Sequence, residues 1–291
     1  MNLVLPPGSF AATPAPVVED TVLLGMPQLC LGGLSETWLL KELGHRHWMG
    51  LARLAGRAVP DFRTADGAPV YAAFSALAVE NADFASLGEN DRLTLRSQLH
   101  RISRTQCASR HDLTCCGRAV GTVNLVSAFV RRAPGGGNHT VARVALDGLP
   151  APTRTGGGRS DSALAARAAA FRAGRTSQDA RFECSQSRDQ EAVLKIDPCP
   201  AQDFNGAGFL YFSSFIAFID RAEWHFDGRR APLATTRARE VYFHGNIDPG
   251  ERVVVRRLKG ERQAGELFHH CRLERAGDGT RLADAFTHRA L

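Results

Sequence analysis

The sequence predicts an α+β protein made of two tandem repeats, each with one long helix followed by antiparallel strands. Two long helical patterns support this prediction: LGGLSETWLLKELGHRHWMGLARLAG at residues 31–56 and DFNGAGFLYFSSFIAFIDRAEWHF at residues 203–226. After each pattern come a strand, a turn and a second strand in the same order. Several matches in one order indicate an internal duplication.

The second helical pattern is apolar on nearly all sides, which is typical of a helix enclosed by a sheet. Its apolar positions are Leu210, Phe212, Phe215, Ile216, Phe218, Ile219 and Ala222. Gly206 and Gly208 stand at its expected start, where unpaired N–H groups and the helix dipole favour developing negative charge. A glycine turn of this kind also serves as an ordinary helix cap, and both interpretations stay open.

The first helix is expected to begin after Gly33, with Ser35 as its N-cap and Glu36 in its first turn. Glu36 either complements the helix dipole or takes part in catalysis. The apolar positions of this helix are Trp38, Leu39, Leu43, Trp48, Leu51 and Leu54.

Strand patterns follow each helix. PVYAAFSALAV (69–79) and EVYFHGNID (240–248) each hold a tyrosine in a similar context, and GENDRLTLRSQL (from Gly88) and PGERVVVRRLKG (from Pro249) form the second strands. We expect turns at 81–91 and 104–110, a long strand at 119–132, a strand at 192–197, and a closing hairpin turned at 277–279. Each set makes an antiparallel sheet that wraps its helix.

The predicted domain division follows from these elements. Residues 1–20 form a loose arm with a short strand after it, 21–150 the N-terminal domain, 151–190 a linker with a short alanine-rich helix at 162–174, and 191–291 the C-terminal domain.

The amino-acid composition and net charge exclude some classes of function. The 291 residues are 44% hydrophobic and 23% charged, as expected of a globular protein with a sizeable core. The net charge of +6 comes mainly from arginine and suits an acidic partner, but no long basic run or nucleic-acid motif is present, so we expect no nucleic-acid partner.

Cysteine spacing and hydropathy exclude other classes. The seven cysteines show no CxxC spacing, so we expect neither a disulfide framework nor a metal site, and Cys115-Cys116 marks a strand boundary. No apolar run reaches the roughly 18 to 20 residues of a membrane span, and the start lacks the pattern of a signal peptide. We therefore expect a cytoplasmic protein without a membrane partner.

A long helix wrapped by an antiparallel sheet is the plan of the hotdog fold, and two copies make a double hotdog. The segments GMPQLCLGGLSETWLLKELGHRHW, VYAAFSA, DFNGAGFLYFSSF and VYFHGNIDPGE resemble the double-hotdog acyltransferase/decarboxylases of polyketide biosynthesis, the leinamycin-pathway type. The resemblance covers roughly residues 25–291, except the linker. It implies a methylmalonyl-CoA or malonyl-CoA substrate, self-acylation, decarboxylation and transfer of the acyl group to an acyl carrier protein, with no cofactor beyond the CoA thioester and the carrier's phosphopantetheine. The resemblance matches Tyr71 to the acylated residue.

The chemistry requires N–H donors at the thioester oxygen and a dry site. Helix starts at Gly32, Gly33 and Leu34 or at Gly206 would supply the donors, and the depth of the pocket depends on how side chains such as Phe74, Phe209 and Trp224 fold inward. Tyr71 is alternatively a strand-packing residue.

Further candidates are polar residues near these elements. His111, expected near a strand start, could orient a carboxylate or be a hydrogen-bonded structural histidine. Asn205 either caps the second helix or holds a substrate carbonyl, and Asn246 with His244 could face the site from the adjoining strand. The pairs Arg131-Arg132 and Arg229-Arg230 would meet CoA phosphates or an acidic carrier, or else be solvated surface.

Two other functions remain open. DFNG also resembles the hydroxybenzoyl-CoA type of hotdog thioesterase, in which Asp203 would be the carboxylate, although Ala207 stands where that family has histidine. The second is a catalytically silent scaffold that binds an acyl carrier. A further homodimer is compatible with the sequence, since two fused hotdogs already pair with each other.

Overall fold

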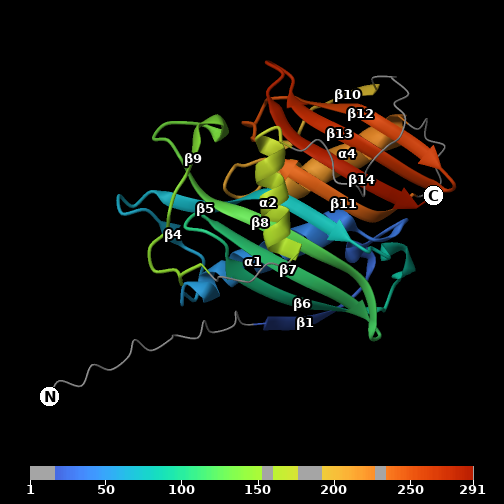
Figure 1. The fold of residues 1–291 in the computed structure, drawn as a ribbon, viewed down its shortest axis with the longest axis horizontal. Coiled ribbons are helices and arrows are strands. Elements are labelled where there is room, and N and C mark those ends of the chain that lie inside the picture. Colours follow the sequence, from blue (N-terminus) through green and yellow to red (C-terminus); the bar gives the residue numbers. More distant parts are fainter. Residues whose placement is uncertain (1–16, 153–159, 176–191, 227–233, 291) are drawn as a thin grey trace.

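One antiparallel sheet of twelve strands forms the frame of the molecule (Figure 1). The computed structural model describes residues 17–152, 160–175, 192–226 and 234–290. The main path of the sheet runs β1-β6-β7-β8-β5-β11-β14-β13-β12-β10, with β4 paired to β5 and β9 paired to β8. Residues 1–16 of the predicted arm at 1–20, the glycine run at 156–158 and Arg229-Arg230 lie outside the described residues, and residues 17–20 of the arm belong to β1 instead.

The elements before the linker are β1 (Val17–Leu23), η1 (Met26–Gln28), β2 (Leu29–Cys30), β3 (Gly33–Leu34), α1 (Glu36–Leu54), β4 (Phe62–Arg63), β5 (Pro69–Glu80), η2 (Phe84–Ser86), β6 (Arg92–Arg101), β7 (Gln106–Cys115), β8 (Arg118–Arg132), η3 (Asn138–Thr140) and β9 (Val141–Arg143). After them come α2 (Ser160–Arg172), β10 (Ala192–Ile196), α3 (Pro200–Asp203), α4 (Phe212–Phe226), β11 (Thr235–Phe243), β12 (Val253–Gln263), β13 (Glu266–Arg275) and β14 (Arg281–Ala290).

The strand order is the same in both repeats when each is followed outward from the centre of the sheet. β5, β8, β7, β6 and β1 follow one another on one side, and β11, β14, β13, β12 and β10 on the other. The repeats meet where β5 and β11 pair antiparallel, with Leu77 opposite Val241. The predicted double hotdog fold is therefore confirmed, with one continuous sheet shared by the two repeats.

The two long helices pack together against the same side of the sheet. Ser35 caps α1 as predicted, since its hydroxyl accepts a hydrogen bond from the Trp38 N–H at 3.3 Å. Gly44 permits the contact between the helices, because a Cβ atom there would lie 2.8 Å from the Phe212 ring of α4. The apolar residues predicted for the second helix pattern are all buried.

Helix α2 covers the opposite face of the sheet, where it crosses in front of the strands in Figure 1. Leu164 and Ala168 pack with residues of both repeats, including Ala78 and Tyr242. Arg167 donates two hydrogen bonds of 2.9 Å to the carboxylate of Glu240, which is 1% exposed. The helix within the predicted linker thus fastens the repeats together across β5 and β11.

Four local expectations are wrong. Helix α4 begins at Phe212, so the glycine turn at 205–209 precedes the helix instead of starting it. Tyr71 is the third residue of β5, whereas Tyr242 is the last but one of β11, so the two tyrosines are not equivalent. Trp224 is 49% exposed and does not fold inward, because it falls on the outer side of α4. His111 lies in the interior of β7, since the turn before β7 ends at residue 105.

Candidate active site at the junction of the repeats

Three loops meet beside the start of α4: the turn at 203–211, the segment 132–139 after β8, and the segment 246–251 after β11. The first and third belong to the C-terminal repeat and the second to the N-terminal repeat. Several of the candidate residues predicted from the sequence lie on or beside these loops: Tyr71, Asn205, Gly206 and Asn246.

The turn at 203–211 is closed by its own hydrogen bonds. The Asn205 side-chain oxygen accepts from the N–H groups of Ala207 and Phe209 at 3.0 and 3.1 Å, and Gly208 has a left-handed φ of 75°. Asn205 thus caps this turn and not α4, as an asparagine does in an Asx turn. Among the described residues, the Gly206 N–H has no acceptor, which leaves one free backbone donor in the turn.

Asn246 aligns the loop after β11 with the turn. Its side-chain oxygen accepts from the Leu210 N–H at 2.9 Å, and its amide nitrogen donates to the Leu210 carbonyl at 3.0 Å. The side chain thereby bonds to both backbone polar groups of Leu210, as a neighbouring strand would, and positions the residues just before α4. Both of its polar ends are occupied, so its predicted part in substrate binding stays a prediction.

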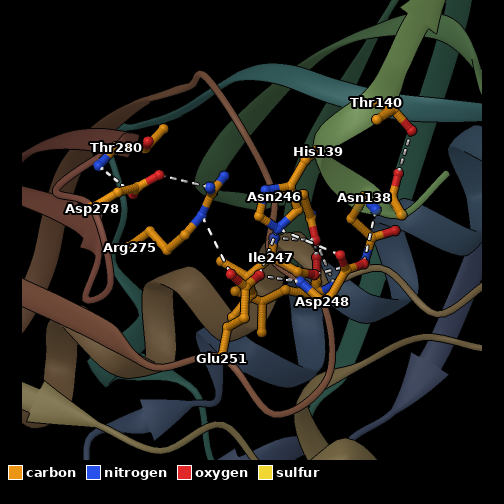
Figure 2. Close-up of polar contacts among 12 residues, drawn as sticks. Asn138, His139, Thr140, Asn246, Ile247, Asp248, Glu251, Arg275, Asp278 and Thr280 are labelled. Carbon is orange, nitrogen blue, oxygen red and sulfur yellow. Dashed lines mark hydrogen bonds and ion pairs between the residues drawn. The ribbon is translucent and has the colours of Figure 1, made fainter.

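Asn138 contacts residues of all three loops and was not found from the sequence; Figure 2 shows it beside Ile247 and Asp248. Its amide nitrogen donates to the carbonyls of Gly208 and Ile247 at 2.8 and 2.6 Å. Its side-chain oxygen accepts two hydrogen bonds from Arg132, at 2.9 and 2.7 Å. Because Asn138 is 2% exposed, these contacts form a buried clamp between the repeats.

Arg132 extends this clamp towards the aromatic residues. One of its terminal nitrogens, Nη2, also donates to the Ala207 carbonyl at 2.6 Å, and its guanidinium carbon lies 3.9 Å from the centre of the Phe209 ring. The other terminal nitrogen, Nη1, has no partner among the described residues. Arg131 pairs with Asp66 at 2.8 Å, so neither arginine of this pair is an uncommitted surface residue.

Tyr71 packs beside these groups at the start of β5. Its ring meets the Phe209 ring edge-on at 5.6 Å between centroids, and the Arg132 guanidinium lies 5.8 Å from its centre. No group in the described ranges hydrogen-bonds to its hydroxyl. The junction therefore combines a half-buried phenol, an uncommitted guanidinium nitrogen and a free backbone N–H.

A polar group at the outer side of the clamp could in geometric terms hold a metal ion. One ligand atom each of His139, Asp248 and Glu251 lies within 4.8 Å of the others. These residues already contact one another: His139 Nε2 lies 2.6 Å from Glu251 and 3.4 Å from the Asp248 carboxylate, and Glu251 accepts from the Asp248 N–H at 2.7 Å (Figure 2). Arg275 is also 3.7 Å from Glu251, and its charge opposes a bound cation.

Asp203, the thioesterase candidate, has a local structural role. Its carboxylate accepts from the Cys199 N–H at 2.8 Å and so caps the short helix α3, and the side chain is 8% exposed. Its backbone carbonyl accepts from Tyr211 and Ser214 at the start of α4. Asp203 is thus committed to the local structure.

The remaining predicted residues lie elsewhere. Gly33 has a φ of 94°, and a Cβ atom there would meet the Phe84 carbonyl oxygen at 2.1 Å, so close backbone packing explains this glycine. Leu34 is buried in the main core, and Gly32 lies beside Thr235 of β11. His111 is 1% exposed and bonded to two serines between α1 and the sheet. The structure does not bring these four residues to the junction.

A buried ionic network lies at the start of α1, and no local sequence pattern indicated it. Glu36 accepts from Thr236 at 2.9 Å and lies 3.3 Å from Arg239, which is 0% exposed and also bonds to Asp220 at 2.7 Å. Burial raises the pKa of Glu36, although the charge of Arg239 opposes the shift. Arg289 continues the network by binding Glu223 at 2.6 Å. Glu36 thus joins the two repeats through charge.

Comparisons with known proteins agree with the fold. No family model matches the sequence, and no curated protein matches it. Among solved structures, the 12:0-ACP thioesterase from Umbellularia californica is similar with a TM-score of 0.66 and 9% identity, over 94% of this chain and 93% of that chain. An acyl-ACP thioesterase from Bacteroides thetaiotaomicron has a TM-score of 0.58 and 11% identity, over 94% of this chain and 97% of that chain. At such low identity, the likeness shows a shared fold.

No helix in the part of the chain described by the structure is long and apolar enough to cross a membrane. Six cysteines lie in that part, and all of them are free thiols.

Proposed function

We propose that the protein is an enzyme acting on acyl thioesters, and that it transfers an acyl group from CoA to an acyl carrier protein with loss of CO2. The observation that carries this proposal is the uncommitted phenol of Tyr71 beside Arg132 at the junction of the repeats. The fold shared with acyl-ACP thioesterases supports an acyl thioester as substrate.

In this proposal the Tyr71 hydroxyl attacks the thioester carbonyl and the thiol of CoA departs. The resulting tyrosyl ester then gives its acyl group to the phosphopantetheine thiol of the carrier. The positively charged Arg132 guanidinium stabilises the negative charge that develops on the Tyr71 oxygen and on the thioester oxygen during the attack, because both oxygens lie at the half-buried junction. The Phe209 ring limits access of water and so protects the ester from hydrolysis.

Decarboxylation of a malonyl-type group breaks its bond to CO2 and leaves an enolate, which needs a hydrogen-bond donor at its oxygen and takes a proton from water at its α-carbon to give the propionyl or acetyl group. The N–H of Gly206 is a free backbone donor three residues before Phe209, whose ring Tyr71 contacts, and Arg132 Nη1 is a second uncommitted donor. We therefore assign substrate positioning to the turn at 205–209, in a reaction that uses no metal or organic cofactor beyond the carrier's phosphopantetheine.

Thioester hydrolysis is the second candidate, favoured by the names of the structural relatives. Two observations count against the mechanism expected from the sequence. The Asp203 carboxylate accepts a hydrogen bond from the Cys199 N–H, and the same turn has Ala207 where the thioesterase family has histidine. A hydrolase acting through Asp203 would therefore have to release the cap of α3.

Intact-protein mass spectrometry with methylmalonyl-CoA and malonyl-CoA, with and without a phosphopantetheinylated carrier protein, tests the proposal. The expected result is a propionyl or acetyl adduct on the carrier that disappears in Tyr71→Phe and persists in Tyr242→Phe. Tyr242 is a matched control because its hydroxyl donates to Glu240 under α2, away from the junction.

Two results would contradict the acyltransferase. Hydrolysis of the CoA thioester that continues in Tyr71→Phe and stops in Asp203→Asn would establish the thioesterase. Carrier binding without turnover of either thioester would establish the scaffold.

A further inference from the structure

A pocket of about 260 Å³ lies in the N-terminal repeat between α1 and strands β1, β6 and β7. It exceeds the roughly 150 Å³ that holds a benzene molecule in a protein core. Gly50 lines it on the helix side, and a Cβ atom there would meet the Leu99 side chain at 3.2 Å. Because Gly50 has no side chain, Leu99 packs close to α1 beside the pocket.

The mouth of the pocket carries balanced charge. Two carboxylates, Asp20 and Glu42, and two guanidinium groups, Arg46 and Arg53, line the pocket. Arg46 pairs with Asp20 at 3.3 Å and with Glu42 at 2.8 Å. The wall also includes the apolar side chains of Leu54 and Leu99. The entrance therefore favours an uncharged ligand with an apolar body.

The floor of the pocket is a continuous array of hydroxyls and imidazoles. Ser97 lies 2.8 Å from His111 Nδ1, Ser109 lies 2.9 Å from His111 Nε2 and 2.7 Å from His47 Nδ1, and Ser127 lies 2.8 Å from His47 Nε2. All five side chains are at least nine-tenths buried, and all but Ser127 line the pocket. Burial lowers the pKa of both histidines to about 3, so both imidazoles are neutral at physiological pH.

The proton count of this array leaves one donor to spare. Two neutral imidazoles and three hydroxyls supply five N–H or O–H protons for four hydrogen bonds. If His47 carries its proton on Nε2, the spare hydroxyl proton belongs to Ser127, outside the pocket. If His47 carries it on Nδ1, the spare proton belongs to Ser97 or Ser109, which line the pocket.

We propose that this pocket binds a small uncharged ligand with one hydrogen-bond acceptor, of the ketone or ester class, whose oxygen accepts the spare hydroxyl proton of Ser97 or Ser109. The ligand's apolar body fills the space beside Gly50. Binding fixes His47 in its Nδ1–H tautomer. This site is separate from the junction and does not depend on the activity proposed there.

Cyclohexanone is the probe. Methylenecyclohexane is the control of the same shape without a hydrogen-bond acceptor, and cyclohexanecarboxylate is the charged control. Binding is followed by side-chain nitrogen NMR of histidine-labelled protein, in which the two ring nitrogens of His47 are distinguished. We expect saturable binding of cyclohexanone, at least fivefold weaker binding of both matched compounds, and a proton on Nδ1 of His47 in the bound state.

Three variants complete the test. Ser97→Ala and Gly50→Leu are expected to weaken cyclohexanone binding at least fivefold, the first by removing a donor and the second by filling the space. Ser75→Ala is the control, because this buried serine donates to the Val126 carbonyl outside the array. Gly50→Ala, which favours the helix, replaces Gly50→Leu if the latter does not fold.

The proposal is overturned if methylenecyclohexane binds as well as cyclohexanone, if the carboxylate binds more tightly, or if bound His47 carries its proton on Nε2. Unchanged binding in both Ser97→Ala and the folded Gly50 variant would also overturn it.

Discussion

Replacing Asn138 with alanine tests whether the clamp between the repeats holds the junction together. The change removes two hydrogen bonds to the carbonyls of Gly208 and Ile247 and two from the Arg132 guanidinium. A neutral hydrogen bond contributes about 1 kcal/mol and one to a charged group somewhat more. Because water can reach part of the half-buried loops, we expect a loss of about 2 to 4 kcal/mol in the free energy of unfolding.

Urea unfolding followed by circular dichroism measures this loss, with an unchanged slope indicating that the unfolded state is unaffected. Asn205→Ala is the matched control, since it removes only the local turn bonds and should cost about 1 kcal/mol. We also expect Asn138→Ala to reduce acyl transfer, because Arg132 loses the oxygen that orients it beside Tyr71. A loss below about 1 kcal/mol together with full activity would refute the idea that this residue joins the repeats.

Three more predictions follow from buried groups. Arg239→Leu should cost about 3 to 5 kcal/mol because it removes the ion-pair partner of the buried Glu36 carboxylate, and adding Glu36→Gln should recover part of this loss in a double-mutant cycle measured by urea unfolding. Since the pKa of His47 and of His111 falls to about 3 on folding, the unfolded chain binds more protons below its histidine pKa of roughly 6.5. Each histidine therefore contributes its full share to the free energy of unfolding above that pH, and this contribution falls by about 1.4 kcal/mol per pH unit between about pH 6 and 3. Thermal melts at a series of pH values should show a smaller pH dependence in His47→Gln. Gly44→Ala should destabilise the protein by about 1 to 3 kcal/mol despite its better helix propensity, because the new methyl group collides with α4, and a melting temperature equal to that of the wild type would contradict this packing.

The repeat structure was predictable from the sequence because it depends on local patterns. Helix α1 shows its cap at Ser35, and the second long helix shows its buried apolar residues. The hairpin turned at 277–279 connects β13 to β14 as expected. Each of these features follows from the order of side chains over one or two turns of backbone.

The start of α4 was placed too early because Asn205 and the glycines after it have the composition of a helix start. In the structure the side chain of Asn246, 36 residues further along, pairs with Leu210 and delays the helix to Phe212. A contact between residues so far apart leaves no signal in the local pattern.

By itself the sequence determined the two long helices, the antiparallel strands that follow them, and the tyrosine and asparagines that lie near the junction. Only the tertiary structure decided that Asn138 clamps the loops, that Arg239 is buried among carboxylates, and that His47 and His111 share a serine. Periodicity reports which side of an element is buried. The partner of a buried polar group is instead set by which strands and loops meet, and these residues come from elements far apart in the chain.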